Sequence, residues 1–281
     1  MSNPRHEANR RSWDTHNDWW AGLDRHEFWR RIPADPPLAF IAPAWQLLTE
    51  LVPQPAGVRV CVLGSGDSYA AFALAALHAR VTAVDISAKR LQTAKARADE
   101  LGLPLDVVRA DAADVAEIDD AAFDLLLTTN GFYVWITDLP SVFGEIHRLL
   151  APGGHFLMYD VHPFQRPWKE TPELAVEKDY WTTGPFEIVE KEGSTFEHHW
   201  SIGDLVSAIA TPGLRITRLI ETAAEDSRFW QDHDYYEPGT EPELLDWRRN
   251  PRAALPVWLT LAAEKPRTNP CPLRSSGPGS R

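Results

Sequence analysis

The sequence has few cysteines, no long apolar run and no excess of basic residues. Its two cysteines are Cys61, within an apolar stretch, and Cys271, in a tail rich in proline, serine and glycine. Such a pair provides neither a disulfide framework nor a thiolate zinc site. No segment reaches the roughly 18 apolar residues of a membrane span, and residues 1–31 lack the apolar core of a signal peptide. We therefore expect a cytoplasmic protein with no membrane partner.

Acidic residues outnumber basic ones, with 40 Asp and Glu against 28 Lys and Arg and a formal net charge of −12. Such a chain repels the phosphate backbone of DNA or RNA unless a local basic stripe intervenes. The densest basic group before the tail is Arg248, Arg249 and Arg252, which is interrupted by a proline and is typical of a solvated loop. A nucleic-acid partner is therefore not expected, and the oligomeric state stays open.

Between Val58 and Asp160, short β-branched runs alternate with longer helical stretches. This rhythm predicts parallel strands joined by crossover helices. The expected strands are Arg59–Leu63, Arg80–Asp85, Pro104–Arg109, Phe123–Thr129 and His155–Tyr159. The expected helices are Tyr69–His78, Ser87–Leu101 and Leu139–Leu150. Ser87 is suited to cap the second helix and Gly102 to end it, and residues 152–154 (Pro-Gly-Gly) predict a turn before the fifth strand.

The remaining segments have weaker patterns. Residues 6–52 are expected to form two helical pieces, separated by prolines, that cover one end of the sheet. Residues 161–200 are expected to be an insertion that contains a β-ribbon. The ribbon strands would be Phe186–Glu190 and Ser194–Trp200, and a helix at Ser201–Ala210 and strands at Leu214–Glu221 and Leu255–Ala263 would follow.

Together these elements predict an α/β fold, a Rossmann-like sheet of seven mostly parallel strands with helices on both faces. The expected organisation is an N-terminal helical lid at 1–54, a Rossmann-like domain at 55–264 and a disordered tail at 265–281. The tail contains no acidic residue and is rich in proline, serine and glycine.

Glycines and polar side chains follow four of the expected strands. The turn Gly64-Ser65-Gly66 follows the first strand, where glycines allow a ligand close to the backbone. Asp85 ends the second strand, where a carboxylate can accept hydrogen bonds from both ribose hydroxyls of an adenosine-containing cofactor. Asp111 follows the third strand, where it can accept the adenine amino group, and Asn130 follows the fourth. The combination predicts a cofactor site at these strand ends.

The sequence here resembles the class I S-adenosylmethionine-dependent methyltransferases, over about residues 55–162. The resemblance rests on residues 62–66 (Val-Leu-Gly-Ser-Gly), 84–87 (Val-Asp-Ile-Ser), 109–112 (Arg-Ala-Asp-Ala), 123–126 (Phe-Asp-Leu-Leu) and 149–154 (Leu-Leu-Ala-Pro-Gly-Gly). It implies S-adenosylmethionine as cofactor, with S-adenosylhomocysteine as product. The residues implied to bind it are Gly64, Ser65, Gly66, Asp85, Ile86, Asp111, Ala112 and Asn130. Ser68 stands where this family often has a third glycine, and capping the first helix is its alternative role.

The flanking segments are similar to a bacterial branch of that family. They are residues 16–20 (His-Asn-Asp-Trp-Trp) and 159–164 (Tyr-Asp-Val-His-Pro-Phe). This similarity implies that the N-terminal helix folds over the cofactor and that the stretch after His162 shapes a pocket for a small-molecule acceptor.

A sulfonium is already a strong methyl donor, so the protein must mainly align the acceptor and exclude water. His162 is the candidate general base, and the alternative is that it hydrogen-bonds the backbone at Pro163. Many tryptophans, 12 in all, suggest an aromatic or heteroaromatic acceptor. The expected substrate-binding residues are Trp20, Trp135, His199 and Trp200. His198 and His199 would point to opposite faces of a strand, and no metal site is expected.

Two other functions are compatible with parts of this pattern. A Gly-rich turn followed by Asp85 also serves an NAD(P)-dependent oxidoreductase, although the third glycine of the dinucleotide motif is missing. A non-catalytic cofactor-binding protein would retain the same residues. Fold alone does not decide whether an oxygen, nitrogen, carbon or sulfur atom of the acceptor is methylated.

Overall fold

The computed structural model describes residues 3–15, 27–169, 174–190, 193–231 and 238–267. Its centre is a seven-stranded sheet with the order β3-β2-β1-β4-β5-β9-β8. The strands are β1 (Arg59–Leu63), β2 (Arg80–Asp85), β3 (Asp106–Arg109), β4 (Phe123–Thr128), β5 (Leu150–Val161), β8 (Arg215–Thr222) and β9 (Trp258–Glu264). Strands β1 to β5 pair in parallel, whereas β9 is antiparallel to both β5 and β8. The predicted Rossmann-like sheet of seven mostly parallel strands is confirmed.

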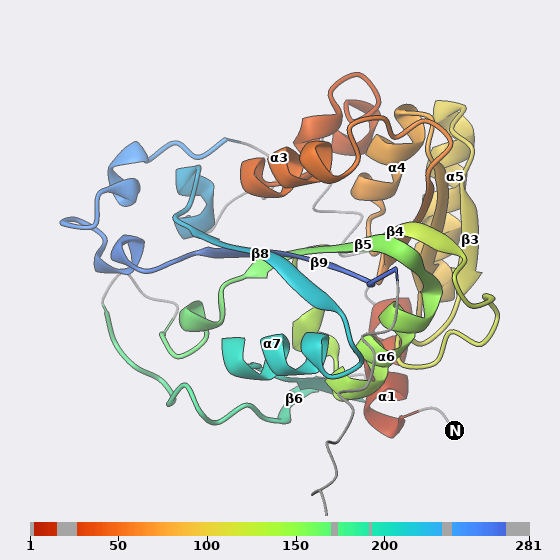
Figure 1. Ribbon diagram of the computed structural model, residues 1–281. Helices are drawn as coiled ribbons and strands as arrows, with labels where there is room; N and C mark the ends of the chain where they lie inside the picture. The colour runs from red at the N-terminus through yellow and green to blue at the C-terminus, as the bar shows by residue number, and fades with distance from the viewer. Residues whose placement is uncertain (1–2, 16–26, 170–173, 191–192, 232–237, 268–281) are drawn as a thin grey trace, which may run out of the picture.

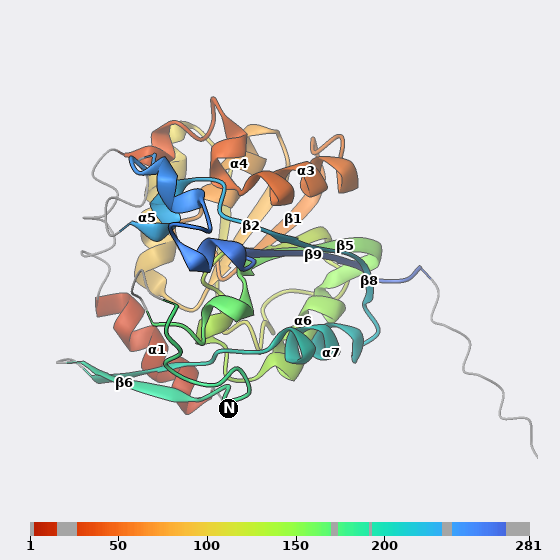
Figure 2. The ribbon, with the colours of Figure 1, turned by 90° about the vertical axis from the view of Figure 1, so that its left-hand side faces the viewer.

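Helices cover both faces of the sheet (Figure 1). The α-helices are α1 (Pro4–Thr15), α3 (Ala42–Leu51), α4 (Tyr69–Ala76), α5 (Ala88–Leu101), α6 (Leu139–Leu149) and α7 (Ile202–Ala210). Short 3-10 helices are η1 (Phe28–Arg30), η2 (Pro36–Ala39), η3 (Tyr133–Trp135), η4 (Pro163–Gln165), η5 (Ser227–Trp230), η6 (Pro242–Leu245) and η7 (Pro251–Ala254). Figure 2 shows α3 and α4 on one side of the sheet and α6 and α7 on the other.

Each face of the sheet has its own hydrophobic core. Side chains of α3, α4 and α5 form the first with the sheet, and those of α6 and α7 form the second. Helix α4 is buried from Ala70 to Ala75, a stretch of alanine and leucine that also contains Phe72. Ser87 caps α5 by accepting the N–H of Arg90 at 3.2 Å, and Gly102 ends it with a φ of 67°, as predicted.

Strand β5 begins five residues earlier than expected. Leu150 pairs with Phe123, but the next pair is His155 with Leu125, so the intervening residues form an irregularity in the strand. Gly153, with a φ of 83°, lies within it. The Pro-Gly-Gly segment therefore bends β5 where the sequence predicted a separate turn.

The two N-terminal helical pieces have different positions. Helix α3 packs on the sheet against β5 and β9, whereas α1 lies beside α5 and the ribbon of β6 (Phe186–Glu190) and β7 (Gly193–Glu197), as Figure 2 shows. The predicted antiparallel ribbon is confirmed, although β7 ends at Glu197 and not at Trp200. Residues 16–20 and most of the predicted tail lie outside the described residues. No helix in the described ranges is both long and apolar enough to cross a bilayer.

Candidate active site

The glycine turn follows β1 at the carboxyl edge of the sheet. Gly64 and Gly66 have φ angles of 65° and 49°, a region that favours glycine. A Cβ at Gly64 would overlap the Phe132 ring, so a side chain of this protein uses the close approach that Gly64 allows. Ser68 precedes α4, but its hydroxyl donates to Ser65 Oγ at 3.3 Å and makes no cap bond. The alternative role of Ser68 as a side-chain cap is therefore wrong, because its backbone is left-handed and its hydroxyl turns towards Ser65.

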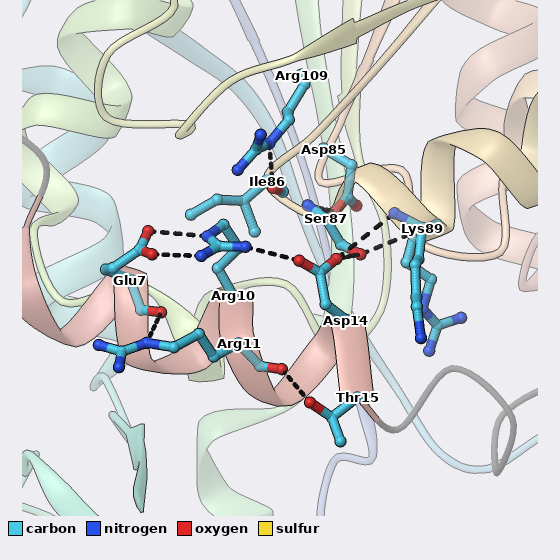
Figure 3. A network of polar contacts seen from close by, with 11 residues as sticks. Glu7, Arg10, Arg11, Asp14, Thr15, Asp85, Ile86, Ser87, Lys89 and Arg109 are labelled. Atoms are coloured by element: carbon cyan, nitrogen blue, oxygen red, sulfur yellow. Dashed lines mark hydrogen bonds and ion pairs between the residues drawn. The ribbon is translucent and has the colours of Figure 1, made fainter. Parts of the chain in front are cut away.

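Asp85 joins the glycine turn to the start of α5. One carboxylate oxygen accepts the N–H of Gly66 and the other accepts the N–H of Ser87, both at 2.9 Å. Burial raises the pKa of Asp85, and the two backbone N–H groups and the Arg90 charge oppose that effect. An ionised carboxylate has about four acceptor sites, so this one keeps capacity for ligand hydroxyls. Ile86 follows it, and its carbonyl accepts from Arg109 Nε at 3.4 Å (Figure 3).

Asp111 is bound by a residue of the N-terminal helix. His6 Nδ1 lies 2.8 Å and 3.0 Å from its two carboxylate oxygens, and His6 Nε2 accepts the N–H of Thr137 at 2.9 Å. Because Nε2 must offer a lone pair to that N–H, the proton lies on Nδ1 and is donated to Asp111. Ala112, next in the chain, is buried. The residue expected to contact adenine is thus hydrogen-bonded to α1 in this structure.

Two further polar residues hold α1 over the carboxyl edge. Asn9, 3% exposed, accepts the N–H of Phe196 at 2.7 Å and donates to the carbonyls of Phe196 and Trp135 at 2.9 Å and 3.2 Å. Asp14 accepts from the Ser87 hydroxyl at 2.6 Å and from Arg10 at 2.6 Å, which places the end of α1 against the start of α5 (Figure 3). Sequence reasoning missed His6, Asn9 and Asp14, because no motif spacing in the sequence distinguishes them from solvated helix positions.

Asp160 organises the loop after β4. Its buried carboxylate accepts the N–H of Gly131 at 2.9 Å, of Val161 at 2.7 Å and of Tyr133 at 3.3 Å. Burial raises its pKa, against these N–H groups and the charge of Arg166. Asn130 Oδ1 accepts the same Val161 N–H at 3.3 Å, so the ends of β4 and β5 are held together. Asp160 belongs to the segment 159–164 that is similar to the bacterial methyltransferase branch, but this role of Asp160 was not predicted from the sequence.

His162 is fully buried beside this loop. Its Nδ1 accepts the N–H of Phe164 at 3.0 Å, and its Nε2 donates to Glu221 Oε1 at 2.7 Å. Burial lowers the pKa of His162, and Glu221 opposes that effect. Since both ring nitrogens are engaged, the geometry favours the alternative in which His162 holds the Pro163 turn. Its role as a general base stays a prediction.

A small recess, partly open to solvent, lies beside this loop. Its walls come from η3, the end of β5, η4, and the residues that follow β7. They include Tyr133, Asp160, Arg166, His198, His199 and Trp200. The expectation that His198 and His199 point to opposite faces is wrong, because β7 ends before them and both line the recess. His199 and Trp200, two of the predicted substrate-binding residues, therefore both line this recess.

Other predicted acceptor residues lie elsewhere. Trp135 contacts Trp13 of α1 edge to face, with ring centroids 5.0 Å apart, and so lies between α1 and η3. Trp20 lies outside the described residues. Within the described ranges, no group of three or more His, Cys, Asp or Glu side chains is arranged to hold a metal ion.

Comparison with known proteins matches residues 61–158 to the family model described as a methyltransferase domain. The ubiquinone biosynthesis O-methyltransferase of Maricaulis maris (strain MCS10) is 32% identical over 98 residues, which are 35% of this chain and 38% of that protein. The chain therefore spans less than half the length of this curated relative.

Solved structures share the fold over a larger part of the chain. An S-adenosylmethionine-dependent methyltransferase from Mesorhizobium loti has a TM-score of 0.59 at 22% identity, covering 79% of this chain and 98% of that one. Geranyl diphosphate C-methyltransferase from Streptomyces coelicolor A3(2) has a TM-score of 0.54 at 17% identity, covering 80% of each chain. Residues 61–158 thus match a methyltransferase domain, and the chain shares the fold of solved S-adenosylmethionine-dependent methyltransferases.

Proposed function

We propose that this protein transfers the methyl group of S-adenosylmethionine to a small aromatic acceptor. The observation that carries the proposal is the position of Asp85, whose carboxylate binds both the Gly66 turn and the start of α5. This turn follows β1, which pairs with β4 on one side and β2 on the other. Strands β2 and β3 continue the sheet in one direction from β1, and β4 and β5 continue it in the opposite direction, so the strand order reverses at β1. Ligands of open α/β sheets bind at such a switch point, beyond the carboxyl ends of the strands.

The residues at these strand ends fit an adenosine-containing cofactor. Asp85 would accept both ribose hydroxyls, and Asp111 with Ala112 would contact the adenine. The turn of Gly64, Ser65 and Gly66 would lie along the methionine part, with Ile86 and Asn130 completing the site. When bound, the cofactor supplies an electrophilic methyl group on a sulfonium, so catalysis rests on alignment and exclusion of water.

The acceptor site is proposed in the recess beside η3. It adjoins the cofactor edge, because Asp160 lines it and also binds the N–H of Gly131 in the loop after β4. Trp200 and His199 provide planar walls for an aromatic ring. The Maricaulis relative is named an O-methyltransferase, which supports oxygen as the methylated atom.

Two alternatives have separate tests. An oxidoreductase would use Asp85 for a nicotinamide dinucleotide, and a non-catalytic protein would bind the cofactor without turnover. The proposal is tested by calorimetric titration with S-adenosylhomocysteine and, in parallel, with NAD(H) and NADP(H). We expect binding of S-adenosylhomocysteine alone, and binding of a nicotinamide nucleotide alone would overturn the assignment. Methyl transfer to a screened set of phenols then distinguishes an enzyme from a binding protein.

A further inference from the structure

We propose that His6 of α1 is a positioning residue for recognition of the cofactor's base. It holds the Asp111 carboxylate so that this group accepts the adenine amino group and rejects a base that carries a carbonyl at that place. This inference rests on the proposed function and concerns the cofactor part of the same site. It gives a residue of the N-terminal helix a role in choosing the base.

His6 bridges two segments at the carboxyl edge of the sheet. Its side chain is 3% exposed, and its Nδ1 lies 2.8 Å from Oδ2 and 3.0 Å from Oδ1 of Asp111. On the other side of the ring, Nε2 accepts the N–H of Thr137 at 2.9 Å. A backbone N–H can only donate, so Nε2 offers the lone pair and Nδ1 carries the proton that Asp111 accepts. The protein backbone thus determines which ring nitrogen faces Asp111 as a donor.

The Asp111 carboxylate keeps capacity for a ligand. Its Oδ1 accepts from His6 and from the N–H of Ala113 at 3.0 Å, whereas its Oδ2 accepts from His6 alone among the described residues. A carboxylate has about four acceptor sites, and the Asp111 side chain is 14% exposed. An amino group of a ligand can donate to the remaining site on Oδ2. A carbonyl oxygen there would instead place two acceptors against each other.

Asp111 follows the strand next to the one that Asp85 ends. Strands β2 and β3 pair in parallel with Asp85 opposite Arg109, and the N–H of Ala110 donates to the Asp85 carbonyl at 3.1 Å. Neighbouring strands lie about 4.8 Å apart, so the two carboxylates belong to the same part of the sheet edge. One adenosine can therefore reach both, with its ribose at Asp85 and its base at Asp111.

The orientation of Asp111 depends on its side-chain bonds, because the residue lies beyond the end of β3. The N–H of His6 lies within reach of both carboxylate oxygens, which fixes the plane of the carboxylate. A polar group that is held in place discriminates against a ligand that lacks its hydrogen-bond partner, since the group is then left unpaired. A carboxylate that is free to rotate can turn towards water and discriminates less.

Other contacts keep α1 in place when His6 is changed. Asn9 bonds to Phe196 of the ribbon through both its N–H and its carbonyl, and Asp14 accepts from the Ser87 hydroxyl at 2.6 Å. These anchors lie on either side of the next turns of the helix and do not involve His6. A substitution at His6 therefore tests its own two bonds and not the docking of the whole helix.

Two substitutions separate the two bonds of His6. In His6→Asn the amide nitrogen can take the place of Nδ1 and donate to Asp111, but nothing replaces Nε2. In His6→Gln the longer side chain can bring its amide oxygen to the place of Nε2 and accept the Thr137 N–H, but no donor remains at Nδ1. His78→Asn is the matched control, because His78 is exposed and precedes β2 at the opposite edge of the sheet. Its φ of 64° is one that asparagine tolerates.

The assay is calorimetric titration with S-adenosylhomocysteine and with S-inosylhomocysteine, which has a carbonyl in place of the adenine amino group. We expect the unmodified protein, His78→Asn and His6→Asn to bind S-adenosylhomocysteine at least about tenfold more tightly, the effect of one hydrogen bond to a charged group. His6→Gln should lose most of this preference. Urea unfolding of the same samples should show a comparable loss of stability in both His6 variants, because each loses one of two hydrogen bonds. A difference in base preference between them is then not explained by stability.

The possible outcomes separate this inference from the proposed function. Failure of the unmodified protein to bind S-adenosylhomocysteine refutes the methyltransferase proposal itself. If the unmodified protein binds it, three results overturn only the role of His6: no preference between the two ligands, a preference retained in folded His6→Gln, or a preference lost in both His6 variants. A His6 variant that does not fold would assign His6 to stability and would overturn the positioning role as well.

Discussion

Replacement of Asp85 by asparagine tests the centre of the proposed cofactor site at nearly constant volume. The carboxylate accepts two backbone N–H bonds at 2.9 Å, and its remaining acceptor sites are proposed for the ribose hydroxyls. An asparagine retains one acceptor oxygen, and its NH2 group must face either Gly66 N–H or Ser87 N–H. One hydrogen bond to a charged group contributes about 1.5–3 kcal/mol. We therefore expect the Kd for S-adenosylhomocysteine to rise about tenfold to 150-fold.

The assay is calorimetric titration, accompanied by denaturant unfolding of the same samples. One backbone N–H that loses its acceptor costs about 1–3 kcal/mol of stability, which a domain of ordinary stability survives. Asp124→Asn is the control, because Asp124 lies on β4 at the other end of the sheet, where it binds Arg59. An unchanged Kd in a folded Asp85→Asn protein would refute the assignment of Asp85 to the cofactor.

Three further predictions concern the same region. His6→Ala removes the bonds to Asp111 and to the Thr137 N–H, and we expect a loss of about 2–4 kcal/mol in the free energy of unfolding, measured by urea titration. Gly64→Ala adds a Cβ at a φ of 65° that overlaps the Phe132 ring, so it should lower Tm by more than Gly57→Ala, whose Cβ meets nothing within 4 Å. Because the pKa of His198 is lowered to about 4, the unfolded chain binds the extra proton first, and stability should fall as the pH drops from about 6.5 towards 4. Urea midpoints over that range should fall less in His198→Gln.

The sheet was predictable because its signals are local. β1 and β4 are short, mostly apolar runs, and the helix signals at Ser87 and Gly102 act within a few residues. The segments that bind the cofactor in the proposed function were found for the same reason, since each directly follows a strand. The start of β5 was missed because Leu150 pairs with Phe123 across an irregularity that no alternation of polar and apolar residues marks.

The contacts that close the site join residues far apart in the sequence. His6 and Asp111 are 105 positions apart, and Asn9 and Phe196 are 187 apart. Single residue types carry no information about such pairs, and a polar helix such as α1 is indistinguishable from a solvated one in the sequence alone. The ribbon was predicted, but its end depended on the backbone of His198 bonding to Val134, a tertiary contact. Both histidines line the recess.

Residues of α1 and the loop after β4 contact residues at the carboxyl edge where the cofactor is proposed to bind. His6 binds Asp111 and Phe132 covers Gly64, so residues of the chain itself contact two of the positions proposed for the cofactor. Asp14 also accepts from the hydroxyl of Ser87, which follows the proposed position Ile86. An apolar lid would lose buried area on opening, whereas these hydrogen bonds can be exchanged for bonds to water or to ligand groups at a small net cost.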